Sequence, residues 1–243
     1  MTRLEAFAVP DLPEVRPGDD LGVLLGAAAY EPGDVLVVAH KVVSKAEGAL
    51  RRLDEVTVSE RAATLAREHG KDPRHVQVIL DESLAVMRAE RGVLICRTRH
   101  GFVCANAGVD ASNAPAAGTV VTLPRDPDAS ARALRSALAT RPAVVIADSF
   151  GRAWRHGQCD VAIGIAGLTV LDDWRGRRDT AGLELRATAI AVADEAAAAA
   201  DLVRDKASRE PAVVVRGLAR FVTDEDGPGA AALVRPVDED LFT

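Results

Sequence analysis

The sequence predicts a mixed α+β fold in which largely antiparallel sheets are flanked by helices. Short apolar runs with strand-like composition outnumber the long amphipathic segments, and several of these runs follow one another with only a glycine turn between them. A doubly wound fold would instead alternate strands and helices in regular order. The 243 residues are enough for one large domain, which we expect to span residues 1–243 with two sub-lobes.

The N-terminal part of the chain predicts a strand, a helix and a second strand. Residues 4–9 form the first expected strand. The helix expected at residues 21–29 follows Asp20, an acid suited to the positive end of a helix. A turn that contains Gly33 then leads into a buried strand at residues 35–39.

The middle of the chain predicts two helices and then an antiparallel meander. Ser59 is suited to cap a helix over residues 59–69, and Gly70 is suited to end it. A shorter helix is expected at residues 73–80. Three short strands separated by glycine turns follow, at residues 84–88, 93–97 and 102–105.

The remaining part predicts a capped helix, apolar strands and an alanine-rich helix. Asp126 places a capping acid before Pro127 at the first helical position, and this helix should run to about residue 140. The run at 143–147 predicts a buried strand, the Gly- and Arg-rich residues 148–160 predict a loop, and residues 224–243 predict a loose tail. The other expected elements are strands at residues 120–123, 183–188 and 211–216, an apolar glycine-containing segment at 161–170, and a helix at 192–203.

Composition argues against several classes of function. The chain has 30 Lys and Arg residues against 36 Asp and Glu, a net charge of −6, which argues against a nucleic-acid partner. No apolar run is long enough to cross a membrane, and the N-terminus lacks the pattern of a signal peptide. Cys96, Cys104 and Cys159 are odd in number and lack CxxC spacing, so we expect reduced core residues in a cytoplasmic protein.

Two acidic segments that follow apolar strands predict a site for a hard cation. Residues 106–113 crowd Asp110 and two asparagines among small side chains. Asp148 and Ser149 follow the apolar run at 143–147. Carboxylate and hydroxyl oxygens suit Mg²⁺ or Mn²⁺, with phosphate supplying further ligands. The alternative is that both acids bond their own backbone in turns.

Basic side chains near these segments predict an anionic ligand. His40, Lys41 and Lys45 follow the second strand, where they could neutralise a triphosphate; the alternative is a solvated helix face. Arg152 and Arg155 suit a phosphorylated or carboxylated substrate, and the alternative for them is a salt-bridged loop. The sequence contains no Walker motif, GxGxxG, GxSxG or HExxH.

Several blocks of sequence together resemble one enzyme family over nearly the whole chain. In order and spacing they resemble the GTP-dependent ligases that attach L-glutamate to the deazaflavin coenzyme F420. In some relatives a flavin-binding nitroreductase-like domain follows, so this chain is expected to be a stand-alone ligase or part of a fusion. The blocks are residues 33–38, 43–48, 106–113, 148–155, 161–164 with 167–168, 193–195 and 211–218.

The resemblance implies a role for each matching position. Lys45, Asp110 and Asp148 would be catalytic, and the two acids would bind Mg²⁺ or Mn²⁺ together with Ser149. GTP would be the co-substrate, and K⁺ is a further candidate ion. The positions implied in nucleotide binding are Leu12, Pro13, Glu14, Val15, His40, Lys41, Lys45, Asn113 and, in a segment at 204–211 that closes over the nucleotide, Lys206. Arg152 and Arg155 stay substrate candidates from the residues alone.

The resemblance also implies a reaction and an assembly. The terminal carboxylate of the unglutamylated coenzyme would attack the γ-phosphate of GTP, and L-glutamate would displace phosphate from the acyl phosphate. A second cycle would add a γ-linked glutamate. Family members look like intertwined homodimers, and we expect the same here. Two alternatives stay open: a related GTP- and metal-dependent amide ligase for a different carboxylate, and a non-catalytic deazaflavin-binding protein.

Overall fold

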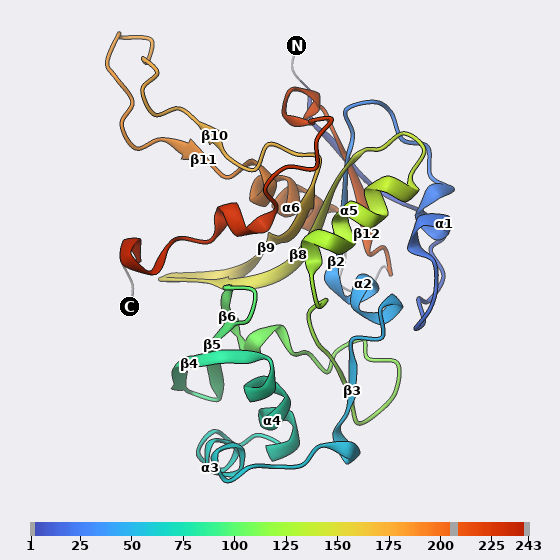
Figure 1. Ribbon diagram of the computed structural model, residues 1–243, viewed down its shortest axis with the longest axis vertical. Helices are drawn as coiled ribbons and strands as arrows, with labels where there is room; N and C mark the ends of the chain where they lie inside the picture. Colours follow the sequence, from blue (N-terminus) through green and yellow to red (C-terminus); the bar gives the residue numbers. More distant parts are fainter. Residues whose placement is uncertain (1–2, 205–208, 241–243) are drawn as a thin grey trace.

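The computed structural model describes residues 3–204 and 209–240. It has the predicted mixed α+β architecture, with mostly antiparallel sheets and flanking helices. Figure 1 shows a larger lobe built on a five-stranded sheet and a smaller lobe formed by residues between 50 and 121. Among the described helices, none combines the length and the apolar composition needed to cross a membrane.

The central sheet joins strands from both ends of the chain. Its order is β1 (Glu5–Ala8), β12 (Ala212–Arg216), β2 (Val35–Ala39), β8 (Ala143–Arg152) and β9 (Arg155–Ala166). Strands β2 and β8 are parallel, and the other neighbouring pairs are antiparallel. The parallel register sets Ala39 opposite Ala147. The next residues of the two strands, His40 and Asp148, therefore reach the same region of the sheet.

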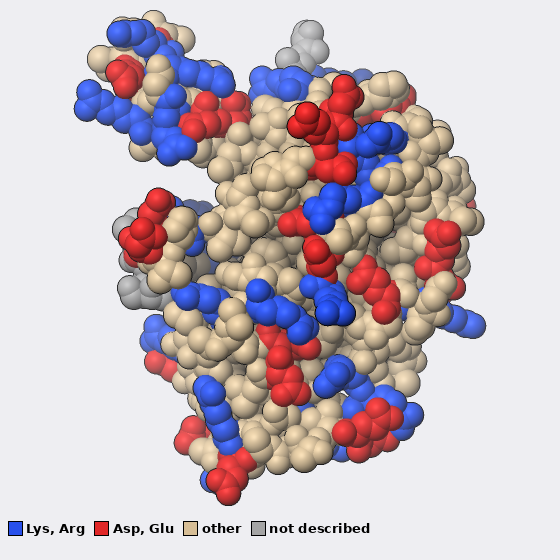
Figure 2. All heavy atoms as spheres, in the orientation of Figure 1, with Lys and Arg blue, Asp and Glu red and all other residues tan. Residues whose placement is uncertain are grey.

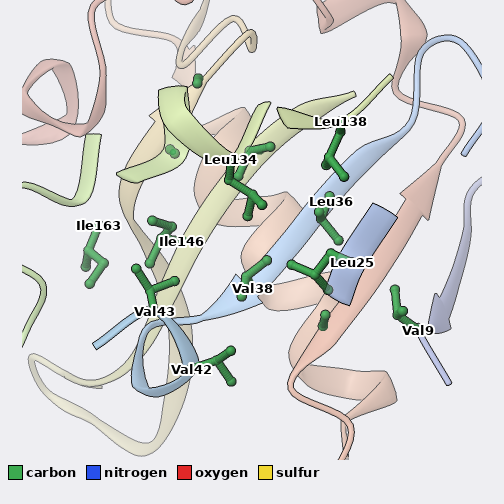
Figure 3. Close-up of a cluster of buried hydrophobic side chains, with 14 of the residues drawn as sticks. Val9, Leu25, Leu36, Val38, Val42, Val43, Leu134, Leu138, Ile146 and Ile163 are labelled. Atoms are coloured by element: carbon green, nitrogen blue, oxygen red, sulfur yellow. The ribbon is translucent and has the colours of Figure 1, made fainter. Parts of the chain in front are cut away.

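Helices cover both faces of this sheet: α1 (Leu21–Gly26) and α5 (Pro127–Ala137) on one face, and α6 (Val192–Val203) on the other. Side chains of β2 alternate between the two cores, as the two-residue period of a strand requires. Leu36 and Val38 pack beneath α1 and α5, as Figure 3 shows, while Val35 and Val37 pack against the alanines of α6. The central strands are therefore buried on both sides.

The close approach of α5 to β9 requires a glycine. A Cβ atom added to Gly164 would lie 2.4 Å from the carbonyl oxygen of Pro127, the first residue of the helix. The predicted cap of this helix is confirmed, because the Asp126 carboxylate accepts a 2.9 Å hydrogen bond from the amide of Ala129. The cap and the glycine together fix α5 against β9, the strand that pairs with Asp148 and Ser149 of β8.

The smaller lobe contains α3 (Glu60–His69), α4 (Pro73–Asp81), the sheet of β4 (Ser83–Glu90), β5 (Val93–Thr98) and β6 (Val103–Ala105), and the pair β3 (Leu50–Arg52) and β7 (Thr119–Val121). The meander predicted for β4 to β6 is confirmed. Ser59 caps α3 by accepting from the amide of Ala62, and Gly70 ends it with a left-handed φ of 65°. Both helix boundaries follow from local sequence.

The loop expected at residues 148–160 is wrong. Strand β8 continues to Arg152, and β9 begins at Arg155, so the segment forms a long hairpin. The outer part of this hairpin is exposed on both faces. It therefore lacks the apolar alternation by which a strand is recognised, and it is held by cross-strand hydrogen bonds instead.

The strand expected at residues 183–188 is also wrong. The structure pairs β10 (Asp172–Asp173) with β11 (Ala189–Ile190), and the chain between them forms an exposed arm that projects from the larger lobe in Figure 1. Leu183 is 68% exposed, so its apolar character does not mark a buried strand face.

The segment expected to be a loose tail makes specific contacts where it begins. Asp226 accepts a 2.7 Å hydrogen bond from buried Arg135 of α5, and the amide of Ala230 donates to Asp128 at 2.9 Å. Short 3₁₀ turns lie at Asn106–Gly108, Leu53–Glu55, Ala219–Phe221, Ala230–Leu233 and Val237–Glu239.

Candidate functional site

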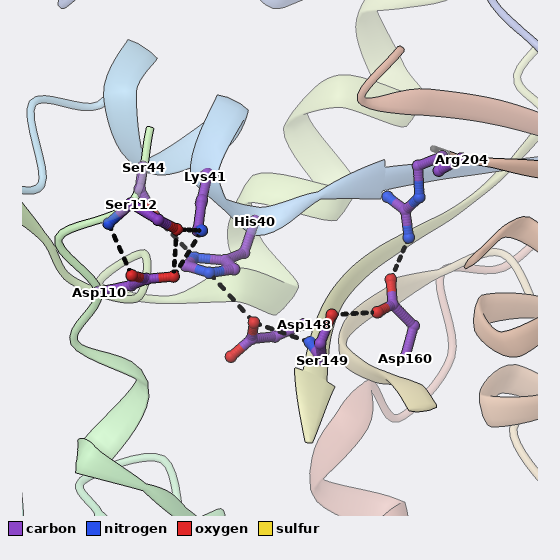
Figure 4. A network of polar contacts seen from close by, with 9 residues as sticks. All are labelled: His40, Lys41, Ser44, Asp110, Ser112, Asp148, Ser149, Asp160 and Arg204. Atoms are coloured by element: carbon purple, nitrogen blue, oxygen red, sulfur yellow. Dashed lines mark hydrogen bonds and ion pairs between the residues drawn. The ribbon is translucent and has the colours of Figure 1, made fainter. Parts of the chain in front are cut away.

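The candidate site lies where the ends of β2 and β8 meet a loop of the smaller lobe. Helix α2 (His40–Ala46) begins directly after β2, so its first residues sit beside Asp148. In Figure 4 the ring of His40 lies between the Asp148 carboxylate and the pair formed by Lys41 and Asp110. The structure thus brings together the two acidic segments that the sequence singled out.

Asp148 is held by the start of α2 and by its own strand. His40 is buried, and its Nε2 atom lies 3.3 Å from Oδ1 of Asp148, while its Nδ1 atom lies 3.4 Å from the hydroxyl of Ser44. The same Asp148 oxygen accepts a 2.8 Å hydrogen bond from the backbone amide of Ser149. The side chain of His40, predicted to bind nucleotide, therefore supports a carboxylate in this structure.

Asp110 forms a compact cluster with Lys41 and Ser112. Lys41 Nζ lies 2.5 Å from the Asp110 carboxylate and 2.6 Å from the Ser112 hydroxyl, and both the amide and the hydroxyl of Ser112 donate to Asp110. Burial raises the pKa of Asp110, but the hydrogen bonds from Lys41 and Ser112 outweigh it, so the pKa lies below its ordinary value. The carboxylate is thus ionised and oriented.

The loop that carries Asp110 is strained where it leaves β6. Asn106 and Ala107 both have left-handed φ angles, 53° and 54°, which non-glycine residues adopt at a cost. Ala107 is buried, and the backbone of Asp110 pairs with Val121 of β7 in an isolated bridge. The packed smaller lobe therefore holds this loop in a conformation that it would not adopt alone.

Lys45 pairs with the N-terminal segment that was predicted to line a nucleotide pocket. Its Nζ atom lies 2.5 Å from the Glu14 carboxylate, with the Lys45 side chain 9% exposed and the Glu14 side chain 67% exposed. Val15 is buried and Leu12 packs against the same core, so this segment is anchored on both sides of Glu14. A hollow of about 480 Å³ lies beside it, lined in part by Pro13 and Glu14.

Ser149 contacts Asp160, a residue that the sequence analysis did not single out. It lies opposite Asp160 in the β8–β9 pair, and its hydroxyl donates a 2.6 Å hydrogen bond to that carboxylate. Arg204, at the end of α6, forms an ion pair with the other oxygen of Asp160. The hairpin pairing could have revealed Asp160, but the expectation of a loop at 148–160 concealed it.

The other predicted site residues lie apart from these contacts or outside the residues that the structure describes. Arg152 and Arg155 are exposed at the outer end of the hairpin, where Arg152 donates to the carbonyl oxygen of His156. Arg152 lies four positions along the strand from Asp148, a distance of about 13 Å. Asn113 is exposed with a left-handed φ of 56°. Lys206 lies outside the described residues.

The candidate metal ligands supply part of the coordination shell of a hard cation. Asp110, Asp148 and Ser149 offer oxygen atoms alone, which Mg²⁺ and Mn²⁺ prefer. Within residues 3–204 and 209–240, no three His, Cys, Asp or Glu side chains come close enough to hold an ion by themselves. Such a set fits a cation that takes its remaining ligands from substrate phosphate and water, as Mg²⁺ commonly does.

Comparison with known proteins relates the whole chain to one family. The family model described as F420-0:Gamma-glutamyl ligase matches residues 11–217. A coenzyme F420:L-glutamate ligase of Methanopyrus kandleri is 49% identical, covering 96% of this chain and 95% of the relative. The protein of the same name from Methanothermobacter thermautotrophicus is 42% identical over 98% of both chains, and that of Archaeoglobus fulgidus is 45% identical over 89% and 88%. The chain therefore belongs to the F420-0:gamma-glutamyl ligase family, as its sequence predicts.

Proposed function

We propose that this protein joins L-glutamate to the unglutamylated form of coenzyme F420 and uses GTP to activate the coenzyme's carboxylate. The observation that carries the proposal is the convergence of two lysines and two aspartates at the ends of β2 and β8, in a chain 49% identical to a coenzyme F420:L-glutamate ligase. These are the groups that a reaction between a carboxylate and a nucleoside triphosphate needs.

The lysines support the proposal because each is oriented by a carboxylate. Lys41 and Lys45 lie one turn apart on α2, with their ammonium groups 2.5 Å from Asp110 and Glu14. A triphosphate would compete with these carboxylates for the two cations. Lysine serves well there because it acts as a compact point charge toward phosphate oxygens.

The proposed reaction has two steps. An oxygen of the substrate carboxylate bonds to the γ-phosphorus of GTP, and the bond from that phosphorus to the β-phosphate oxygen breaks, giving an acyl phosphate and GDP. The amine of glutamate then attacks the acyl carbon, loses a proton and expels inorganic phosphate. When bound, Mg²⁺ or Mn²⁺ would offset the charge that gathers on the phosphates. Asp110, Asp148 and Ser149 are the residues that would hold it.

We infer a homodimer from the shape of the chain. The β8–β9 hairpin and the arm between β10 and β11 both project from the larger lobe in Figure 1, and they carry exposed apolar side chains. Trp154 at the hairpin tip is 81% exposed, and Leu183 on the arm is 68% exposed. Large apolar side chains left exposed on projecting segments, on the arm among the charged side chains that Figure 2 shows, are candidates for an association surface. Light scattering coupled to size exclusion should give twice the mass of 25.6 kDa, and a monomer would contradict the inference.

Product analysis tests the proposed function. The protein is incubated with GTP, Mn²⁺, L-glutamate and the unglutamylated coenzyme, and the products are followed by mass spectrometry. We expect one or more glutamyl additions with equal formation of GDP. Asp148→Ala serves as the inactive control. Absence of any glutamyl product, with folded protein and all substrates present, would reject the function.

A further inference from the structure

Two buried side chains, Asp160 and Arg204, lie behind Ser149, which is one of the candidate metal ligands. The Ser149 hydroxyl lies 2.6 Å from one oxygen of Asp160, and Arg204 forms an ion pair with the other. The side chains of Arg204 and Asp160 are 8% and 5% exposed. Figure 4 shows these three residues in line, on the far side of Asp148 from His40. Asp160 is not among the residues implied by the family resemblance, and Arg204 enters it only as the first residue of the segment at 204–211, with no contact to Asp160 implied.

The chemistry of Arg204, Asp160 and Ser149 fixes the direction of the hydrogen bonds between them. A guanidinium group keeps its protons, so Arg204 can only donate. An ionised carboxylate paired with it can only accept. The hydroxyl proton of Ser149 is therefore directed to Asp160, and the lone pairs of the Ser149 oxygen are directed elsewhere.

We propose that Asp160 and Arg204 are positioning residues that make the Ser149 hydroxyl an acceptor within the site. This inference rests on the proposed function. A serine oxygen held in this way can bind a cation, but its proton is not available to a phosphate oxygen. Carboxylates behind a metal ligand commonly orient it in this manner and raise its basicity.

Arg204 also links these three residues to β2, the strand that leads into α2. It donates a 3.3 Å hydrogen bond to the carbonyl oxygen of Pro211, which accepts a 2.8 Å hydrogen bond from the amide of Ala39. Ala39 immediately precedes His40, whose ring contacts Asp148. Arg204 and the amide of Ala39 thus share one carbonyl acceptor, which places Arg204 beside the end of β2.

A double-mutant cycle tests the proposal by a binding measurement. Mn²⁺ affinity is measured from the electron paramagnetic resonance signal of the free ion, in the presence of a non-hydrolysable GTP analogue, for Asp160→Asn, Ser149→Ala and the double variant. We expect Asp160→Asn to weaken Mn²⁺ binding by about 10–100-fold. In the Ser149→Ala background the same substitution should cause no further loss, because Asp160 acts through Ser149. Losses that multiply in the double variant would overturn the proposal.

Two controls separate this proposal from the proposed function. Asp173→Asn removes a carboxylate paired with an arginine on the exposed arm, and it should leave Mn²⁺ affinity unchanged. Asp148→Ala should weaken Mn²⁺ binding at least as strongly as Asp160→Asn. If Asp148→Ala has no effect, the metal site itself is wrong. If Asp148→Ala weakens binding and Asp160→Asn does not, the positioning role alone is wrong.

Folding of the variants is followed by thermal unfolding. If Asp160→Asn does not fold, the cycle is repeated with Asp160→Glu, which keeps a negative charge for Arg204 but moves the carboxylate by one methylene. The same expectation applies: weaker Mn²⁺ binding with serine at position 149 and no added effect with alanine there. Unchanged affinity with serine present would contradict the proposal.

Discussion

At the scale of single residues, the site is defined by charges that are already paired in the chain itself. Lys41 and Lys45 are held by Asp110 and Glu14, and Asp148 is held by His40. Hydrogen bonds that involve charged groups contribute more than neutral ones, about 1.5–3 kcal/mol each. Ligand binding must exchange these contacts for others of similar strength. Truncating one of these side chains should therefore change the affinity for the ligand measurably.

Lys45 provides the most direct residue-scale prediction. Replacing Lys45 with alanine removes a cation that is buried next to the N-terminal segment, so kcat/KM for GTP should fall by about 10–100-fold, the equivalent of one charged hydrogen bond. Steady-state kinetics measure this change. Lys71→Ala, in the smaller lobe, is the matched control and should stay near wild type. Unchanged kinetics for Lys45→Ala would remove it from the site.

The cysteines should be dispensable for activity. Burial raises the pKa of the Cys104 thiol to about 12, and it also raises the pKa values of Cys96 and Cys159. Because the thiolate is the reactive form, alkylation at pH 8 should be slow and should reach half-buried Cys159 first. Peptide mapping by mass spectrometry follows the labelling alongside activity. Rapid inactivation that substrate prevents would contradict this view.

At the scale of secondary structure, the capped helix starts and the buried strands were predictable, whereas the exposed hairpin was not, and α1 and α5 end three residues earlier than expected, at Gly26 and Ala137. Capping residues act locally, so Ser59 and Asp126 identify the starts of their helices from sequence alone. Strands buried on both faces appear as short apolar runs such as residues 35–39. The outer part of the β8–β9 hairpin is held by pairing between two polar segments, and composition does not reveal such pairing.

Gly164 tests the packing of α5 on the central sheet. Gly164→Ala places a methyl group against the Pro127 carbonyl, so the helix must shift, and the free energy of unfolding should fall by about 1–3 kcal/mol. Gly151→Ala is the matched control on the same hairpin, because a Cβ atom there meets nothing within 4 Å. Urea unfolding compares the two variants. Equal stability would show that the contact relaxes without cost.

Asp72, the cap of α4, gives a prediction for pH. The hydrogen bond from Arg74 is the main cause that lowers the pKa of Asp72 from 3.8 to about 2. A depressed carboxylate pKa stabilises the fold above pH 3.8, and this contribution is lost as the pH falls toward 2. Asp72→Ala should therefore lower the unfolding free energy by about 1 kcal/mol at pH 7 and by less at pH 3. An equal difference at both pH values in urea unfolding would contradict the assignment.

At the scale of the whole molecule, the sequence singles out residues of the candidate site but does not encode how they are arranged. Asp110, Asp148, Lys41 and Lys45 were each marked by position after an apolar strand. Their convergence depends on the parallel pairing of β2 with β8 and on the smaller lobe that carries Asp110, and no local pattern encodes either. Arg152 and Arg155, close to Asp148 in sequence, lie along an extended hairpin and are carried away from it.

The fate of the carboxylate oxygen tests the central claim most directly. The unglutamylated coenzyme is labelled with ¹⁸O in its terminal carboxylate and incubated with GTP, L-glutamate and Mn²⁺, and the phosphate released is examined by mass spectrometry. Attack of the carboxylate on the γ-phosphate predicts one ¹⁸O atom in each inorganic phosphate, with no turnover in Asp148→Ala. Unlabelled phosphate alongside glutamylated product, or label recovered in GMP, would contradict the account.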